Sequence, residues 1–223
     1  MTMQYGFVQN IEGYLGKDSG DFDVLIILRE PHNKENEQTE EFWLKNELEK
    51  YNKTGKCNAT RYINLLGRLV GMVTGVPIEQ NCGDKMKQCA ELLQERCAFM
   101  NFSPFKGATS KTEIYDNILG EFKDLSFVEN YQTEQITAKS SSQKIAKNRM
   151  QIIRQFAKNG DKPKYIITTE DIFNALLKNN TVEKSLLKHK NKVFCKGKIG
   201  NNTTVFSFYH PSYTHIRYYE LEK

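Results

Sequence analysis

The feature that most constrains the fold is an unbroken run of five apolar residues, Val-Leu-Ile-Ile-Leu, at positions 24–28. A strand with one face in water alternates apolar and polar side chains, whereas a strand covered on both faces is apolar throughout. The run is far shorter than the roughly 20 apolar residues that cross a bilayer. Residues 23–28 therefore predict a strand inside a parallel sheet.

Helical and strand patterns alternate along the rest of the chain. Helices are expected over residues 39–48, 62–73, 84–95, 141–158 and 170–177, and further strands over residues 97–101, 164–169, 192–195 and 203–208. This alternation is typical of a parallel sheet with helices on both faces. We therefore expect one α/β domain in three layers over residues 1–223, with a candidate helical insertion at residues 111–142.

Composition excludes several classes of protein. Hydrophobic residues make up 39% of the 223 residues and charged residues 26%, which is ordinary for a globular domain and unlike a disordered chain. The N-terminus has no basic segment followed by an apolar one, so we expect a cytoplasmic protein without a membrane partner. The five cysteines form no CxxC pair, so we expect reduced thiols, with Cys89 and Cys97 buried, and neither a structural zinc nor an iron–sulfur cluster.

The net charge of +5 is unevenly distributed. Between positions 144 and 198 there are fourteen Lys or Arg residues and only four Asp or Glu residues. Such a segment is typical of a surface that faces phosphates, and equally of a solvated helix face. Composition leaves both interpretations open.

Polar groups follow three of the expected strands. Ligands of open α/β sheets bind beyond the carboxyl ends of the strands, and Glu30, Asn101 and His210 stand just after residues 28, 100 and 208. Singly, each has an ordinary structural interpretation: a capping acid, a turn-forming amide and a hydrogen-bonded histidine. The fold is expected to bring all three to one edge of the sheet, which favours a site there.

The order of these motifs resembles that of the uracil-DNA glycosylase superfamily. The residues that carry the resemblance are Glu30-Pro31-His32 after the first strand, Asn101-x-Ser103-Pro104 after the second, and His210-Pro211-Ser212 after the last. The stretch Phe42-Trp43-Leu44-Lys45 is similar to the Phe-Trp-Lys stretch of the mismatch-specific branch. The resemblance implies a three-layer α/β/α sandwich with a central, mostly parallel four-stranded sheet.

The resemblance also implies a reaction and a partner, DNA, and it implies no metal and no organic cofactor. Cleavage of an N-glycosidic bond passes through an oxocarbenium-like sugar that a carboxylate stabilises, and the departing base gains negative charge. The implied catalytic residues are Glu30 and His210; the implied base-binding residues are Asn101, His32, Phe42 and Trp43; the implied DNA-binding residues are Ser212, Tyr213 and Thr214. The base is expected to leave the stack and to be read by the Asn101 amide.

Other interpretations remain beside this one. The first motif departs from the family pattern, because Leu28 stands where a glycine is usual and Glu30 is longer than the usual Asp. There are two alternatives: a non-catalytic nucleic-acid or nucleotide-binding protein with the same fold, and an α/β enzyme that acts on a free nucleoside or other small molecule. Trp43 is more readily interpreted as a core helix residue than as a stacking surface, and residues 168–171 as a helix N-cap with acids in the first turn.

Overall fold

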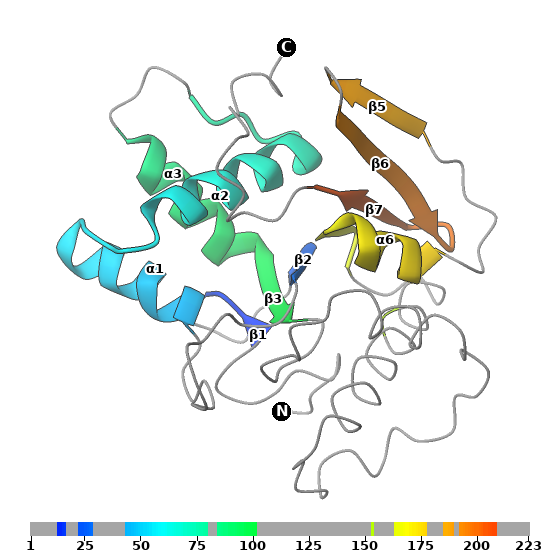
Figure 1. Cartoon of the computed structure of the whole chain (residues 1–223). Coiled ribbons are helices and arrows are strands. Elements are labelled where there is room, and N and C mark those ends of the chain that lie inside the picture. The colour runs from blue at the N-terminus through cyan, green and yellow to red at the C-terminus, as the bar shows by residue number, and fades with distance from the viewer. Residues whose placement is uncertain are drawn as a thin grey trace, which may run out of the picture.

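The computed structural model describes residues 13–16, 22–28, 43–79, 84–101, 153, 163–177, 185–189 and 192–208 (Figure 1). The described strands are β1 (Gly13–Tyr14), β2 (Val24–Leu28), β3 (Cys97–Asn101), β4 (Tyr165–Thr168), β5 (Ser185–His189), β6 (Lys192–Ile199) and β7 (Thr203–Ser207). The described helices are α1 (Trp43–Thr54), α2 (Thr60–Thr74), α3 (Lys85–Arg96) and α6 (Glu170–Leu177). The predicted α/β class is confirmed.

The strands form one mixed sheet in the order β1-β3-β2-β4-β7-β6-β5. β2 is parallel to both β3 and β4, and β4 is parallel to β7. The remaining pairs, β1 with β3, β5 with β6 and β6 with β7, are antiparallel. The sheet is therefore larger than the expected four strands, because antiparallel strands extend it at both ends.

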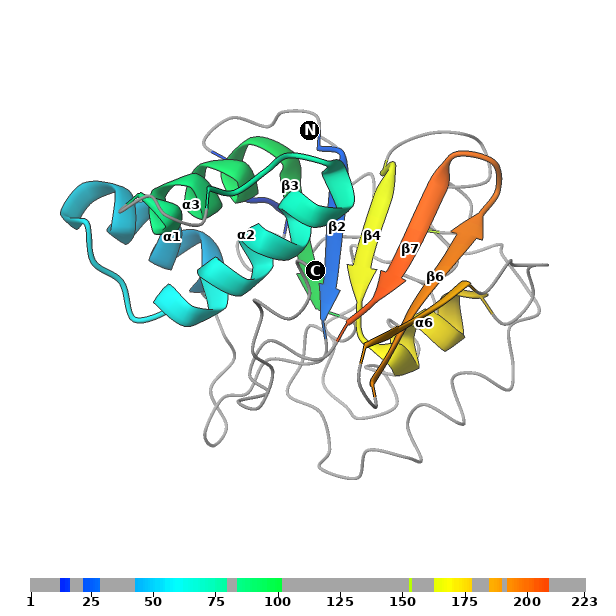
Figure 2. The same ribbon diagram turned by 90° about the horizontal axis from the view of Figure 1, so that it is seen from above.

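The two faces of the sheet bury separate apolar clusters. Along β2, Val24, Ile26 and Leu28 belong to the cluster that includes α1, α2 and α3, whereas Leu25 and Ile27 belong to the cluster that includes α6. Figure 2 shows β2, β4, β7 and β6 side by side, with α1–α3 gathered at one side and α6 at the other. The apolar run is thus explained as predicted, since both faces of β2 lie against other parts of the protein.

The expected helices agree closely with the described ones. The predicted apolar face of α2 (Ile63, Leu66, Leu69 and Val70) is buried, and α3 and α6 begin and end within one residue of their predicted bounds. Helix α1 continues to Thr54, beyond the expected end at residue 48. The expected helix 141–158 lies outside the described residues except for Ile153, which is helical and buried.

Helices α2 and α3 pack against each other very closely. A Cβ atom at Gly67 would lie 2.4 Å from the Cβ and 2.6 Å from the Cα of Cys89. Only a glycine permits this approach, because the Cα of Cys89 cannot rotate away. Helix α1 stabilises the start of α2, where the buried Glu47 carboxylate accepts hydrogen bonds from the backbone N–H groups of Asn58 and Ala59.

Strand β6 shows where the expected boundaries were wrong. Residues 197–202 were expected to form a connection, whereas β6 continues to Ile199 and the turn occupies residues 200–202, with Gly200 at φ +59°. Cys195, Gly197 and Ile199 alternate with exposed Lys196 and Lys198, which is the period of a strand. The two lysines and the glycine are more typical of a connection than of a strand, so the alternation was missed in the sequence.

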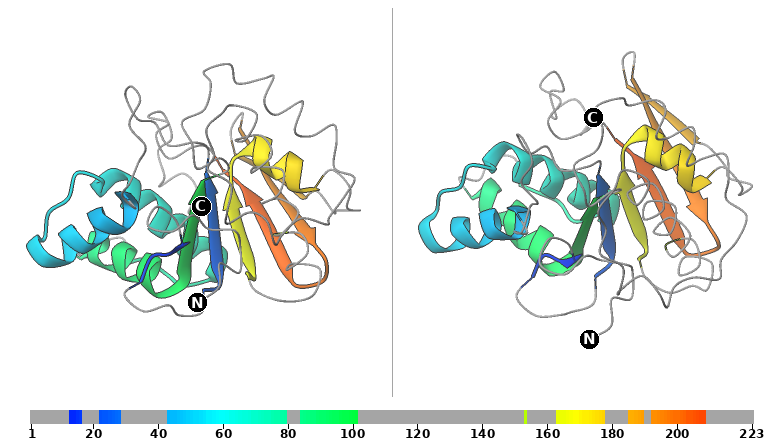
Figure 3. Two further views of the ribbon diagram at one scale, coloured as in Figure 1. Left: turned by 90° about the horizontal axis from the view of Figure 1, so that it is seen from below. Right: turned by 60° about the horizontal axis from the view of Figure 1, so that its bottom comes forward.

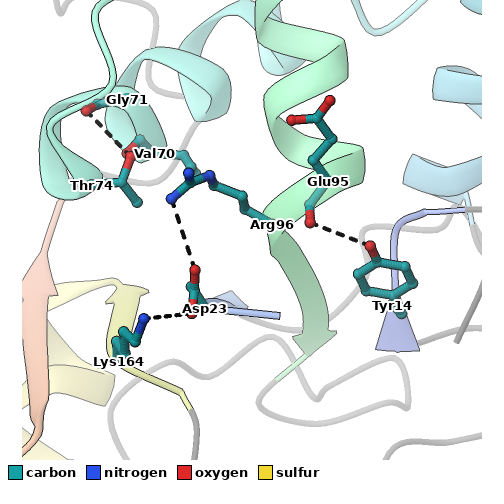
Figure 4. A network of polar contacts seen from close by, with 8 residues as sticks. All are labelled: Tyr14, Asp23, Val70, Gly71, Thr74, Glu95, Arg96 and Lys164. Carbon is teal, nitrogen blue, oxygen red and sulfur yellow. Dashed lines mark hydrogen bonds and ion pairs between the residues drawn. The ribbon is translucent and has the colours of Figure 1, made fainter. Parts of the chain in front are cut away.

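The amino edge of the parallel strands is held by a small ionic cluster (Figure 4). The Asp23 carboxylate lies 3.3 Å from Lys164 Nζ and 3.8 Å from Arg96 Nη1. Asp23, Arg96 and Lys164 each precede a strand, so the cluster joins the starts of β2, β3 and β4. Because all three side chains are partly exposed, we expect it to contribute little to stability.

Candidate functional site at the carboxyl edge of the sheet

The carboxyl ends of the parallel strands meet at the opposite edge. Leu28 of β2 pairs with Asn101 of β3, Ile27 of β2 pairs with Thr168 of β4, and Thr168 pairs with Ser207 of β7. The strand order changes direction at β2, since the next strand in the sequence, β3, lies on one side of it and β4 on the other. Ligands of open α/β sheets bind beside such a switch point. This edge is therefore the candidate site.

Buried polar side chains concentrate at this edge. Among the described residues, six polar or charged side chains are buried, and four of them are Asn101, Thr168, Thr169 and Ser207. The other two have structural roles elsewhere: Glu47 caps α2, and Thr203 donates a hydrogen bond to the carbonyl of Pro163 at the amino edge. Burying polar groups carries a desolvation cost, so their clustering marks this edge as chemically distinct.

The pleat divides the three of these residues that lie in strands, Asn101, Thr168 and Ser207, between the two faces. Asn101 continues the row of Cys97 and Phe99, which face α1–α3, and it pairs with Leu28 of the same cluster. Thr168 and Ser207 continue the rows of Ile166 and Val205, which face α6. Alternate residues of a strand point to opposite faces, so Asn101 does not share a face with Thr168 and Ser207.

The Thr168 and Ser207 hydroxyls hold the sheet together at its edge. Thr168 Oγ1 donates a 2.8 Å hydrogen bond to the carbonyl of Ile27, and Ser207 Oγ accepts a 3.1 Å hydrogen bond from the backbone N–H of Cys195. The Phe208 N–H donates to the carbonyl of Thr168. These bonds join β2, β4, β7 and β6. The two hydroxyls therefore fix the positions of these strands at the carboxyl edge, here called the rim.

Replacement of Thr168 by valine is expected to destabilise the protein by about 1–3 kcal/mol, because it removes a buried donor and keeps the side-chain shape. Thr168→Ser, which retains the hydroxyl, is the matched control and is expected to lose less. Urea unfolding followed by circular dichroism measures both free energies. Equal losses in the two variants would show that the hydroxyl contributes nothing.

Only part of the predicted site lies in the described residues. Asn101 is described, and it is buried at the carboxyl end of β3 as expected. The other predicted site residues, apart from Trp43, lie outside the described residues: Glu30, His32, Phe42, His210, Ser212, Tyr213 and Thr214. β2 ends two residues before Glu30 in the sequence, and β7 ends three residues before His210.

Trp43 is described, and its interpretation as a core residue is wrong. Its side chain is 48% exposed at the first position of α1, and its ring meets that of Tyr62 edge to face at a centroid distance of 5.3 Å. The apolar face of α1 is supplied instead by Leu44 and Leu48. An exposed indole held by a second ring retains a surface on which a flat group can stack.

Two ionisable groups of the described residues have a raised pKa. Burial raises the pKa of the Cys97 thiol far above its usual range, with Arg96 opposing and Asp23 adding to that shift. Burial also raises the pKa of the Tyr62 hydroxyl. Both shifts favour the protonated form, so neither group is chosen as the candidate nucleophile or base.

The described cysteines agree with the sequence-based expectation for thiols. Cys57, Cys89, Cys97 and Cys195 are free, and Cys89 and Cys97 are buried as predicted. Within the described ranges, no cluster of three or more His, Cys, Asp or Glu side chains is arranged to hold a metal ion. None of the helices in that part of the chain is both long enough and apolar enough to cross a bilayer.

Sequence reasoning attached no role to Ser207 and gave residues 168–171 a capping role. The missed signal is that Thr168 and Ser207 end their strands directly after the apolar pairs Ile166-Ile167 and Val205-Phe206. Helix α6 does begin at Glu170, and the carbonyl of Thr169 accepts a hydrogen bond from the N–H of Phe173. Of the basic segment, Lys164 lies at the amino edge, away from the candidate site.

No protein-family model, curated protein or solved structure matches this chain.

Proposed function

We propose that the chain is a divergent uracil-DNA glycosylase-like enzyme that hydrolyses the N-glycosidic bond of a deaminated or damaged base in DNA. The observation that carries the proposal is the burial of Asn101 at the carboxyl end of β3, beside the end of β2. A neutral amide at this position supplies both a donor and an acceptor, as reading the edge of an extruded base requires.

The sheet order supports the same proposal. The parallel strands β3-β2-β4-β7 end at one edge, and the motifs with Glu30 and His210 follow β2 and β7 in the sequence. In the proposed enzyme a three-layer α/β/α sandwich of the glycosylase kind carries both motifs to the rim that Asn101 occupies. Apolar clusters on both faces of the sheet are consistent with that architecture.

The proposed roles follow from the chemistry of the bond. The Glu30 carboxylate stabilises the oxocarbenium-like sugar and orients the attacking water, and His210 stabilises negative charge on the departing base. Asn101 reads the base, His32 limits its size, and the exposed ring of Trp43, with Phe42 beside it in the sequence, offers a stacking surface. Ser212 and Thr214 bind a phosphate of the DNA, and Tyr213 is the wedge that fills the gap in the strand.

The test is an assay for abasic sites. Labelled oligonucleotides that contain uracil, hypoxanthine or xanthine, single-stranded and paired, are incubated with the protein and then treated with alkali. Strand cleavage at one modified base is expected. Absence of cleavage at every base, together with salt-dependent DNA binding, would leave the non-catalytic binding protein as the function.

A further inference from the structure

A second surface carries the groups that nucleic-acid binding requires, and it lies on one face of the sheet, reaching from Thr204 to Phe206 beside the rim. In one row across three strands, Tyr165 of β4 pairs with Thr204 of β7, which pairs with Lys198 of β6. In the next row Phe206 pairs with Lys196. Directly paired residues point to the same face, so these five residues form one surface, here called the β7 face.

The β7 face lies opposite α6. The residues that alternate with its members, among them Val205, Ile199 and Cys195, belong to or pack against the cluster that includes α6. The β7 face is on the side of the sheet that carries α1–α3, since Tyr165 and Phe206 pack against the cluster that includes these helices, but Figure 3 shows β6 and β7 at the end of the sheet remote from α1. Lys196 and Lys198 are exposed, and Tyr165, Thr204 and Phe206 are half-buried.

Cations and aromatic rings adjoin on this face. The ammonium group of Lys196 lies 5.8 Å from the centroid of the Phe206 ring. That ring lies 6.5 Å from the ring of Tyr165 and stacks at 6.2 Å on the ring of Phe208, which is buried. The Tyr165 and Phe208 rings therefore support the Phe206 ring, and Lys196 lies beside it.

The charge of these strands is entirely positive. The sequences of the three strands of the β7 face, β4, β6 and β7, contain three lysines, Lys192, Lys196 and Lys198, at alternate positions of β6, and no acidic residue. A sheet surface that needed only solubility would carry both signs. A surface of one sign with no opposing carboxylate on its strands is complementary to a polyanion.

We propose that the β7 face binds single-stranded nucleic acid, with phosphates at Lys196 and Lys198 and a base stacked on Phe206. The lysines alone would bind any polyanion. The Phe206 ring favours a single-stranded nucleic acid among polyanions, because an unpaired base can stack on it. The Lys196 ammonium moves from the ring to a phosphate when the base arrives. This surface goes beyond the proposed glycosylase site and does not depend on it.

The test is fluorescence anisotropy of a short labelled oligothymidylate, titrated with the full chain at several salt concentrations. The double variant Lys196→Gln/Lys198→Gln is expected to bind more weakly and to reduce the slope of log K against log salt by about 1.4, since each phosphate contact with a single strand contributes about 0.7. Phe206→Leu is expected to weaken binding about fivefold or more without changing that slope.

The matched control is Lys53→Gln/Lys56→Gln, which removes the same charge from exposed positions at the end of α1 and just after it. The control is expected to bind like the unmodified protein. Equal losses in the two double variants would overturn the proposal, because net charge alone would then explain binding. A second outcome would also overturn it: polyglutamate competes as effectively as oligothymidylate, and Phe206→Leu does not weaken binding. That outcome would indicate a site for acidic proteins.

Thermal unfolding of each variant shows whether it is folded. If Phe206→Leu does not fold, the lysine variants still test the proposal. The abasic-site assay is independent of this titration. Loss of strand binding in the lysine variants without base release by any form of the protein would support the β7 face and reject the glycosylase assignment.

Discussion

Glu30→Gln is expected to abolish release of the damaged base, with a loss in rate of about 10²-fold or more, while DNA binding stays within about twofold. The amide keeps the size of the side chain and removes the charge that stabilises the oxocarbenium-like sugar. His210→Ala is expected to give a comparable loss, because the departing base then lacks its stabilising contact. Single-turnover kinetics in the abasic-site assay measure the rate, and anisotropy measures binding.

Glu37→Gln is the control for this experiment, because it removes the same charge from the same segment between β2 and α1. It is expected to retain full activity. Unchanged base release in both Glu30→Gln and His210→Ala would reject the roles assigned to them. A parallel loss of binding and activity in Glu30→Gln would indicate instead that the carboxylate supports the structure of the rim.

Gly67→Ala is expected to destabilise the protein by about 2 kcal/mol or more. Helix propensity alone predicts the opposite sign, a gain of about 1 kcal/mol, since glycine is a poor residue for a helix interior. The new Cβ, however, would lie 2.4 Å from the Cβ and 2.6 Å from the Cα of Cys89. Overpacking against backbone costs about 3 kcal/mol, because no rotamer change relieves it. Urea unfolding measures the sign directly.

Gly75→Ala separates overpacking from backbone strain. Gly75 ends α2 at φ +71° with no heavy atom within 4 Å of a Cβ built there, so alanine meets only the strain of a left-handed conformation. We expect a loss of about 1 kcal/mol for this variant. A stabilised Gly67→Ala would show that α2 and α3 separate at little cost and that their close packing is unimportant.

The core of the fold could be predicted from local patterns. The apolar runs of β2 and β3 and the 3.6-residue periodicity of α2 required burial on particular faces, and the structure buries them there. Of the extra strands, β1 and β5 were not predicted, and β6 was predicted only over residues 192–195. β1 has two residues, and β6 carries three lysines, so both depend on a partner strand to supply their hydrogen bonds.

The sequence predicted where in the fold the candidate site lies, but not the contacts within it. Sequence order put Asn101 directly after an apolar stretch, and the rule for open sheets placed it at the carboxyl edge. The sequence did not reveal that Thr168 Oγ1 would bond to Ile27, 141 positions earlier, or that Trp43 would be exposed beside Tyr62. Such contacts depend on which segments meet in space.

The sequence by itself determined the α/β class, the buried strands and the apolar faces of the helices, because periodicity is a local property that each segment carries alone. The tertiary structure decided the strand order, the antiparallel extension of the sheet and the direction of each polar side chain at its edge. It also brought Lys196 and Phe206 of neighbouring strands onto one face. These features depend on register between distant segments, and a shift of one residue would reverse every one of those faces.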